Sequence, residues 1–138
     1  MQQTIDAQAW PIAPEQSQVT PMQTPHAPWL STHVLDVERG QPAAGVTVAL
    51  SRRDGDTLVP VAAAETGSDG RIQRLGGETL PAGVYQLAFD TATYLRGHGH
   101  DTPFLQRVVV EFHLADSGGH YHVPLLLSPY SCTSYRGS

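Results

Sequence analysis

The segment HYHVPLLLSPYSCTSYRGS, residues 120–138, carries the densest set of chemically useful side chains in the sequence. His120 and His122 are two residues apart, so on a β-strand both rings lie on the same face. A neutral imidazole can accept or donate a proton near neutral pH, because its reference pKa is about 6.5. The same spacing also suits two ligands of a zinc ion. The pattern therefore predicts either a proton-transfer site or part of a metal site.

A zinc site needs three or four ligands. The remaining candidates are His98, His100 and His113, but no spacing links them to the first pair. Covalent catalysis by serine is not indicated, since Ser128 and Ser131 both lack the Gly-x-Ser-x-Gly pattern of a strained nucleophile turn. We therefore favour proton transfer without a metal and predict no cofactor. The HGH sequence at 98–100 is expected to lie in a loop without a catalytic role.

Short apolar segments separated by turn residues predict the elements that position these side chains. The 13 glycines and 11 prolines favour many turns over long helices. Strands are expected at 31–37, 46–54, 57–66, 84–90, 107–115, 120–127 and 130–137, and one short helix at 91–97. Strands that recur every ~8–12 residues are typical of a β-sandwich. We predict an all-β fold with two sheets and roughly eight strands.

The chain divides into two regions by composition. Residues 1–28 contain five of the prolines and six glutamines and show no periodicity. We expect them to form a disordered or loosely attached N-terminal arm. Residues 29–138 are expected to form the sandwich domain, and a chain of 138 residues is hardly long enough for a second one.

The expected strand 120–127 is apolar on both faces. Positions 123, 125 and 127 lie on one face, and His122, Pro124 and Leu126 lie on the other. A sandwich strand with one solvated face normally carries polar side chains there. We therefore expect another subunit to cover the second face, with His122 at the interface between subunits.

Charge and composition exclude several functions. The net charge is −5 and no basic run is present, which argues against nucleic acid or an anionic membrane as a partner. The sequence has no lysine, so neither Schiff-base chemistry nor a phosphate-loop lysine is available. No apolar run approaches the ~20 residues that span a bilayer, and no targeting signal is visible. The single Cys132 excludes an internal disulfide, and we expect a cytoplasmic protein.

Two sets of motifs resemble a known family. The first, VLDVERGQPAAGVTVAL, ETGSDGRI and LPAGVYQLAF, is similar to the scaffold of prealbumin-like β-sandwiches, many of which are binding modules. The second, the ending HYHVPLLLSPYSCTSYRGS together with LSTHVLD at 30–36 and SDGR at 68–71, resembles the transthyretin-like 5-hydroxyisourate hydrolases. The resemblance spans residues 30–138. It implies hydrolysis of 5-hydroxyisourate in urate degradation and a homotetramer built as a dimer of dimers.

The resemblance also implies a set of site residues. The family's catalytic residues fall on His33, Arg71 and His122. The residues that shape the substrate site fall on the C-terminal tail, Tyr135, Arg136, Gly137 and Ser138. Transthyretin itself, a hormone carrier, shares SPYS but lacks the histidines, the arginine and the Tyr-Arg-Gly-Ser end. A small-ligand carrier without catalysis is therefore the alternative.

Strand alternation adds expectations about the tail. Cys132 stands where the family more often has an aromatic residue or glycine, and alternation puts it on the face opposite Thr133 and Tyr135. We therefore expect Cys132 to point away from the site and Tyr135 to share the face of His33 and His122. Asp36 and Asp69 are expected to serve turns.

The residue types suit hydrolysis of a ring amide. Water must lose a proton as it attacks, which a neutral histidine can accept. The carbonyl oxygen gains negative charge, which a guanidinium can stabilise while it holds a planar heterocycle. A nearby arginine also favours the neutral form of histidine. On these grounds we expect His33 and His122 to transfer protons and Arg71 to bind the substrate and its developing charge.

Overall fold

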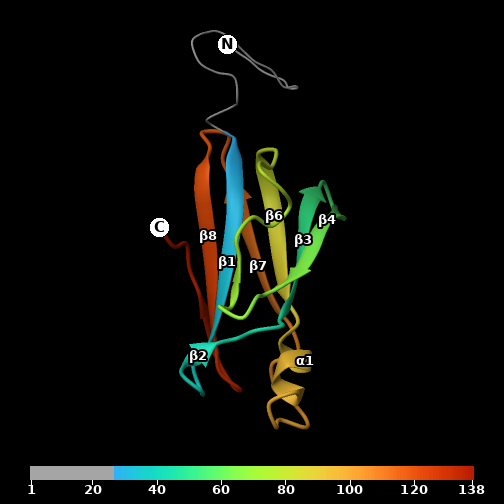
Figure 1. Cartoon of the computed structure of the whole chain (residues 1–138). Helices are drawn as coiled ribbons and strands as arrows, with labels where there is room; N and C mark the ends of the chain where they lie inside the picture. Colours follow the sequence, from blue (N-terminus) through green and yellow to red (C-terminus); the bar gives the residue numbers. More distant parts are fainter. Residues whose placement is uncertain (1–26) are drawn as a thin grey trace, which may run out of the picture.

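The computed structural model describes residues 27–138, which form nine strands and one helix in two facing layers (Figure 1). The predicted arm at 1–28 lies outside the described residues except for its last two, and Pro28 already belongs to the first strand. The predictions of an all-β sandwich and of one short helix are confirmed.

One sheet contains both ends of the described chain. Its strand order is β2-β1-β8-β9, and β5 pairs with the same edge of β1 as β2 does. The bounds of these strands are β1 Pro28–Asp36, β2 Gln41–Pro42, β5 Arg71–Ile72, β8 Gly119–Leu127 and β9 Cys132–Ser134. The central pair β1 and β8 is parallel and runs in register from Pro28 beside Gly119 to Asp36 beside Leu127. Residues some ninety positions apart in sequence are therefore neighbours in this sheet.

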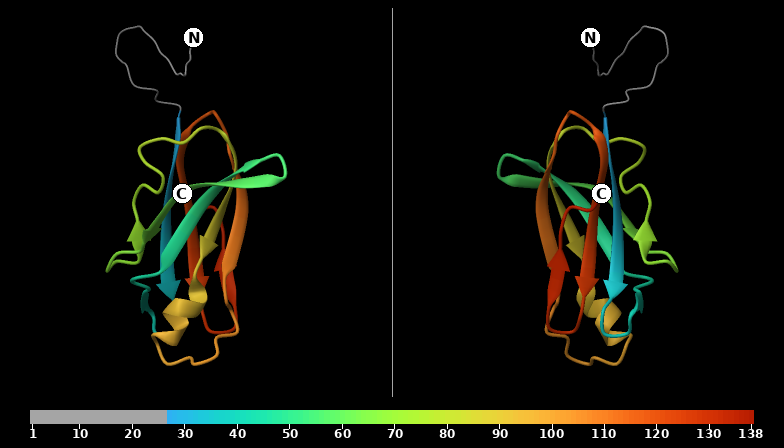
Figure 2. Two further views of the ribbon diagram at one scale, coloured as in Figure 1. Left: turned by 90° about the vertical axis from the view of Figure 1, so that its right-hand side faces the viewer. Right: turned by 90° about the vertical axis from the view of Figure 1, so that its left-hand side faces the viewer.

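The second sheet is antiparallel throughout and has the order β4-β3-β6-β7. Its strands are β3 Thr47–Asp54, β4 Thr57–Glu65, β6 Gly83–Phe89 and β7 Val108–Leu114. The tip of the β3–β4 hairpin projects from the body of the sandwich in the side views (Figure 2).

The core lies between the two sheets and follows from the alternation of apolar residues. On β1 the inward side chains are Leu30, Thr32 and Val34, all fully buried. On β8 every second residue from Tyr121 to Leu127 is buried, and these side chains meet the buried residues of β3 and β6. Because successive side chains of a strand point to opposite faces, the residues between them on β1 and β8 form the outer face of the sheet.

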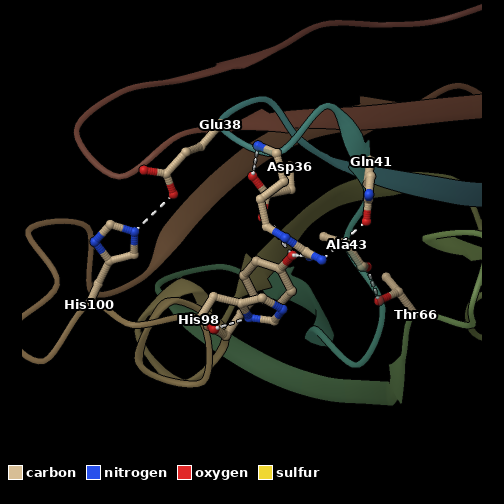
Figure 3. A network of polar contacts seen from close by, with 9 residues as sticks. Asp36, Glu38, Gln41, Ala43, Thr66, His98 and His100 are labelled. Carbon is tan, nitrogen blue, oxygen red and sulfur yellow. Dashed lines mark hydrogen bonds and ion pairs between the residues drawn. The ribbon is translucent and has the colours of Figure 1, made fainter.

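Helix α1 (Thr91–Arg96) closes one end of the sandwich (Figure 1). Asp90 caps its N-terminus by accepting a hydrogen bond from the backbone of Thr93. The buried Tyr94 hydroxyl donates to Asp36 at the end of β1, with 2.7 Å between the oxygens. The other carboxylate oxygen of Asp36 accepts the backbone N–H of Arg39, which confirms its predicted role in a turn. Figure 3 shows this network, which joins β1 to the helix.

The C-terminal segment differs from its prediction. A strand was expected over 130–137, but β9 covers only Cys132–Ser134 and is followed by an isolated bridge between His122 and Gly137. The reason is a turn in which Ser128 and Ser131 bond each other through backbone and side chains. Cys132 pairs with Leu127, so its register places it on the sheet side opposite His122, as predicted.

The outer face of β8 is partly covered by the chain itself. Pro124 is buried and Leu126 is half-buried without any second copy. The chain itself therefore buries part of the face of β8 that we expected another subunit to cover.

Within residues 27–138 the structure contains no helix with the length and apolarity that a bilayer crossing requires.

Candidate active site

The parallel pairing of β1 and β8 brings the first site residues together. Ser31 and His33 alternate with the buried residues of β1, so both lie on the outer face. On β8 the same alternation places His120 and His122 there. The register sets Ser31 beside His122, and the Ser31 hydroxyl oxygen lies 2.7 Å from His122 Nδ1.

Arg71 reaches this face through a tight turn that ends in the short strand β5. Its register places Arg71 directly opposite His33. The Asp69 carboxylate accepts the backbone N–H of Arg71 at 3.0 Å, which confirms the predicted role of Asp69 in the turn. Gly70 adopts φ +77°, and a Cβ at this position would lie 2.6 Å from the carbonyl oxygen of Val34. Only glycine lets the turn approach β1 closely enough to pair Arg71 with His33.

The end of the chain closes the site from the other side. The backbone N–H of Gly137 donates to the carbonyl of His122 at 2.7 Å. Figure 1 shows the C-terminus returning alongside β8. A small cavity of about 120 Å³ opens here, and it is lined by Ser31, Thr32, Arg71, Ile72, Gln73, His120, His122 and Ser138. Its walls therefore combine imidazole, guanidinium and hydroxyl groups with the last residue of the sequence.

The electrostatics of the site favour neutral histidines. Burial lowers the pKa of His122 below its usual 6.5, and the nearby His120, Arg71 and His33 lower it further. The pKa of His33 is also lowered, first by burial and then by Arg71, while Asp69 opposes this effect. Both rings can therefore accept a proton at neutral pH, which is the state that a general base requires.

The structure brings some of the predicted residues together and separates others. Arg71, His122 and Ser138 line one cavity, and His33 flanks it opposite Arg71. Tyr135 was expected on this face, but Tyr135 and Arg136 line a different cavity of about 410 Å³ between the sheets, next to β7, β8 and β9. Alternation fails for Tyr135 because regular pairing of β9 ends at Ser134.

Two further residues belong to the site: Ser31, for which the sequence predicts no role, and His120, which is predicted only as one of a histidine pair. Ser31 contacts both His120 and His122, and His120 lines the cavity. The available signal was the period of two: Ser31 precedes His33, and His120 precedes His122, by two positions on the same strand faces.

The additional histidines considered as metal ligands lie elsewhere. His98 bonds the carbonyl of Tyr94, His100 bonds Glu38, and His113 lines the larger cavity. Within residues 27–138, no three His, Cys, Asp or Glu side chains converge as a ligand set.

The fold is that of the prealbumin-like β-sandwiches, and the cavity on its outer face is lined by imidazole, guanidinium and hydroxyl groups. The chain belongs to the HIUase/Transthyretin family, which matches residues 30–137.

Individual relatives agree with this assignment. The chain is 49% identical over 115 residues to the 5-hydroxyisourate hydrolase of Deinococcus radiodurans, an alignment that covers 80% of this chain and 97% of the relative. Among solved structures, 5-hydroxyisourate hydrolase of Klebsiella pneumoniae superimposes with a TM-score of 0.72 at 37% identity, covering 80% of this chain and 99% of that one. Transthyretin of Sparus aurata gives 0.73 at 37% identity, covering 78% and 95%.

These comparisons test two predictions made from the sequence, the family and the enzymatic function. The predicted family is confirmed, and the prediction of an enzyme is confirmed by curated relatives that carry the name of a hydrolase.

Proposed function

We propose that this chain hydrolyses 5-hydroxyisourate to 2-oxo-4-hydroxy-4-carboxy-5-ureidoimidazoline, a step of urate degradation in purine catabolism. The observation that carries the proposal is the cavity that Arg71 and His122 both line, with His33 opposite Arg71 on the paired strands. The relatives named for this activity support the choice of substrate. The proposed location is the cytoplasm, which is compatible with a single, unpaired cysteine.

The proposed mechanism needs only groups that line or flank the cavity. His33 and His122 handle two protons, one from the attacking water and one to the ring nitrogen that leaves when the amide bond breaks. Arg71 holds the planar substrate and stabilises the negative charge that develops on the carbonyl oxygen. No covalent intermediate with the protein forms, and no metal or other cofactor takes part.

The proposed substrate-binding residues are those of the C-terminal tail. Gly137 bonds the backbone of His122, and Ser138 lines the cavity. The guanidinium of Arg136 lies 4.1 Å from the ring centre of Tyr121, and Tyr135 lines the cavity beneath. In our proposal Tyr135 and Arg136 contribute by anchoring the tail, which places the last two residues against the substrate.

We also propose that the protein assembles as a homotetramer, a dimer of dimers, in which the outer faces of β1 and β8 line a channel. The half-buried Leu35, His122 and Leu126 on this face support the proposal, because a second copy would complete their burial.

Turnover of the substrate tests the proposed function directly. Purified protein is added to freshly oxidised urate, and the ultraviolet absorbance of 5-hydroxyisourate is followed. We expect the decay to accelerate in proportion to the protein concentration. Binding of the substrate without faster decay would favour the alternative, a small-ligand carrier.

A further inference from the structure

The Ser31 hydroxyl lies between two imidazole rings. Its oxygen is 2.5 Å from His120 Nε2 and 2.7 Å from His122 Nδ1. Ser31 is buried, with only 5% of its surface exposed. A hydroxyl has a single proton, so it can donate to one of these nitrogens while it accepts from the other. The proton positions on the two rings are therefore linked through Ser31.

A stack of flat side chains holds the His120 ring in place. His120 lies over Trp29 with 3.8 Å between the ring centres and 8° between the planes. The guanidinium of Arg74 lies 3.7 Å from the Trp29 ring centre. His120 is exposed, so stacking rather than burial fixes its orientation toward Ser31.

The hydrogen bond to Ser31 also determines which nitrogen of His122 serves the cavity. Nδ1 is occupied by Ser31, which leaves Nε2 as the nitrogen available to a ligand. The ring edge that carries Nε2 faces the chain end, since a Cβ at Gly137 would lie 2.7 Å from His122 Cδ2.

We propose that Ser31 and His120 are positioning residues that form a proton relay behind His122. When Nε2 of His122 takes a proton from water, the Nδ1–H bond breaks and that proton passes to Ser31. The original hydroxyl proton of Ser31 passes to His120 Nε2. The sequence reverses when His122 gives its Nε2 proton to the leaving nitrogen, so no net proton is gained. The kinetic consequences of this inference rest on the proposed function. The hydrogen-bonded link between the two histidine rings does not depend on it.

The relay has a physical advantage over a single histidine. A protonated His122 would face Arg71 and His33, both of which oppose positive charge there. Burial and Arg74 also lower the pKa of His120, but His120 is more exposed than His122, so water can solvate a charge there. Ser138 also lines this cavity.

Kinetics of four variants test the proposal. Ser31→Ala breaks the link, and Ser31→Thr keeps a hydroxyl and should restore most of the rate. His120→Phe keeps the stack on Trp29 but loses the bond, whereas His120→Gln keeps a hydrogen-bonding group that cannot take up the proton. We expect Ser31→Ala, His120→Phe and His120→Gln to lower kcat by about 10- to 100-fold, by analogy with groups that orient metal-binding histidines, with little change in KM. His100→Phe, the same change at a remote histidine, should leave the rate unchanged.

The pH profile adds a readout that a purely structural role would not move. Loss of the positive charge of His120 raises the pKa of His122, so the acidic limb of kcat/KM should shift to higher pH in His120→Phe. Unchanged kcat in His120→Gln, or an unchanged acidic limb in His120→Phe, would overturn the relay.

Ring NMR of the substrate-free protein separates this inference from the proposed function. The nitrogen shifts of His122 should show one dominant neutral tautomer, and Ser31→Ala or His120→Phe should redistribute it. Identical His122 shifts in all three proteins would contradict the link, whatever the substrate. Failure of the unmodified protein to consume 5-hydroxyisourate would instead refute the proposed function.

Discussion

Arg71 is one of the groups that favour the neutral form of the two histidines around it. It lies opposite His33 on the paired strands and lines the cavity of His122. Burial and this guanidinium both lower the pKa of each ring, so the residue proposed to bind the substrate also keeps its neighbours neutral.

Removal of any of the three proposed catalytic side chains should be costly. We expect His33→Ala, His122→Ala and Arg71→Ala each to lower kcat/KM by ~10²–10⁴-fold, the range for loss of an acid–base or charge-stabilising group. The rate is measured from the ultraviolet decay of 5-hydroxyisourate, and circular dichroism checks that the fold persists.

The matched controls are His98→Ala and His100→Ala, which remove rings that bond Tyr94 and Glu38 away from the cavity. Both should retain nearly full activity, and a chelator should have no effect on the unmodified protein. Full activity of His122→Ala, or loss of activity with chelator and its recovery with zinc, would favour a metal mechanism.

The dependence of the rate on pH follows from the lowered histidine pKa values. A neutral base works only above its pKa in the folded protein, so kcat/KM should fall as the pH decreases through a value below 6.5. Arg71→Gln removes a charge that lowers the pKa of both rings. The acidic limb of the residual activity should therefore move to higher pH. A limb above 6.5 in the unmodified protein, or no movement in the variant, would contradict this account.

At the scale of residues, sequence patterns succeed where a strand is regular. Alternation correctly places His122 and Cys132 on opposite sides of the first sheet. It fails for Tyr135, since pairing of β9 stops at Ser134 and the chain then turns toward the larger cavity. The link between His120 and Ser31 depends on the register of two distant strands, which no local pattern contains.

At the scale of elements, the turn before β5 carries Arg71 and depends on Gly70. A side chain at Gly70 would be strained by the positive φ, and its Cβ would lie 2.6 Å from the carbonyl oxygen of Val34. We expect Gly70→Ala to destabilise the protein by more than the ~1–3 kcal/mol of conformational strain alone and to lower activity by displacing Arg71. Urea unfolding and the rate of substrate decay measure the two effects.

Gly55 provides the control for this substitution. It has a similar φ of +62°, but nothing lies within 4 Å of the position of a Cβ. Gly55→Ala should therefore show the strain without the collision and should retain full activity. Equal losses of stability in the two variants would show that the close approach at Gly70 is unimportant.

A buried hydrogen bond from Tyr94 joins helix α1 to Asp36 of β1, and Asp36 is labelled in Figure 3. Tyr94→Phe leaves one oxygen of the buried Asp36 without its 2.7 Å partner, so we expect a loss of ~1–3 kcal/mol in the free energy of unfolding. Tyr130→Phe, at a residue that is 76% exposed, should change it very little. Urea unfolding at one protein concentration compares them, and equal stability would contradict the structural role of the bond.

The elements themselves are largely predictable from sequence. Each of the seven expected strands overlaps an observed strand, and the helix appears at Thr91–Arg96 after the Asp90 cap. The strands β2 and β5 are missing from the prediction because two residues are too short to show a period of two. Their pairing is set by turns and by the exposed edge of β1, which are properties of the folded sheet.

At the scale of the whole molecule, the proposed assembly concerns the outer face of the first sheet. A tetramer would have about four times the chain mass of 14.9 kDa, and light scattering combined with size exclusion measures it. We expect this mass at micromolar protein concentration together with full activity. A stable and active species of 14.9 kDa would refute the proposed assembly.

The pairing of β1 with β8 has a consequence for how the protein is made. Ser31 and His122 are 91 residues apart in sequence, and the strands between them pair with near neighbours such as β3 with β4 and β6 with β7. The β3–β4 hairpin has a short loop, and β6 and β7 are separated only by the segment that contains α1, so both pairs can form while the chain is still being synthesised. The β1–β8 contact closes the longest loop of the fold and has to wait for the last strands to leave the ribosome. The proposed active site is therefore completed late in biosynthesis, when one pairing event forms the sheet and the cavity together.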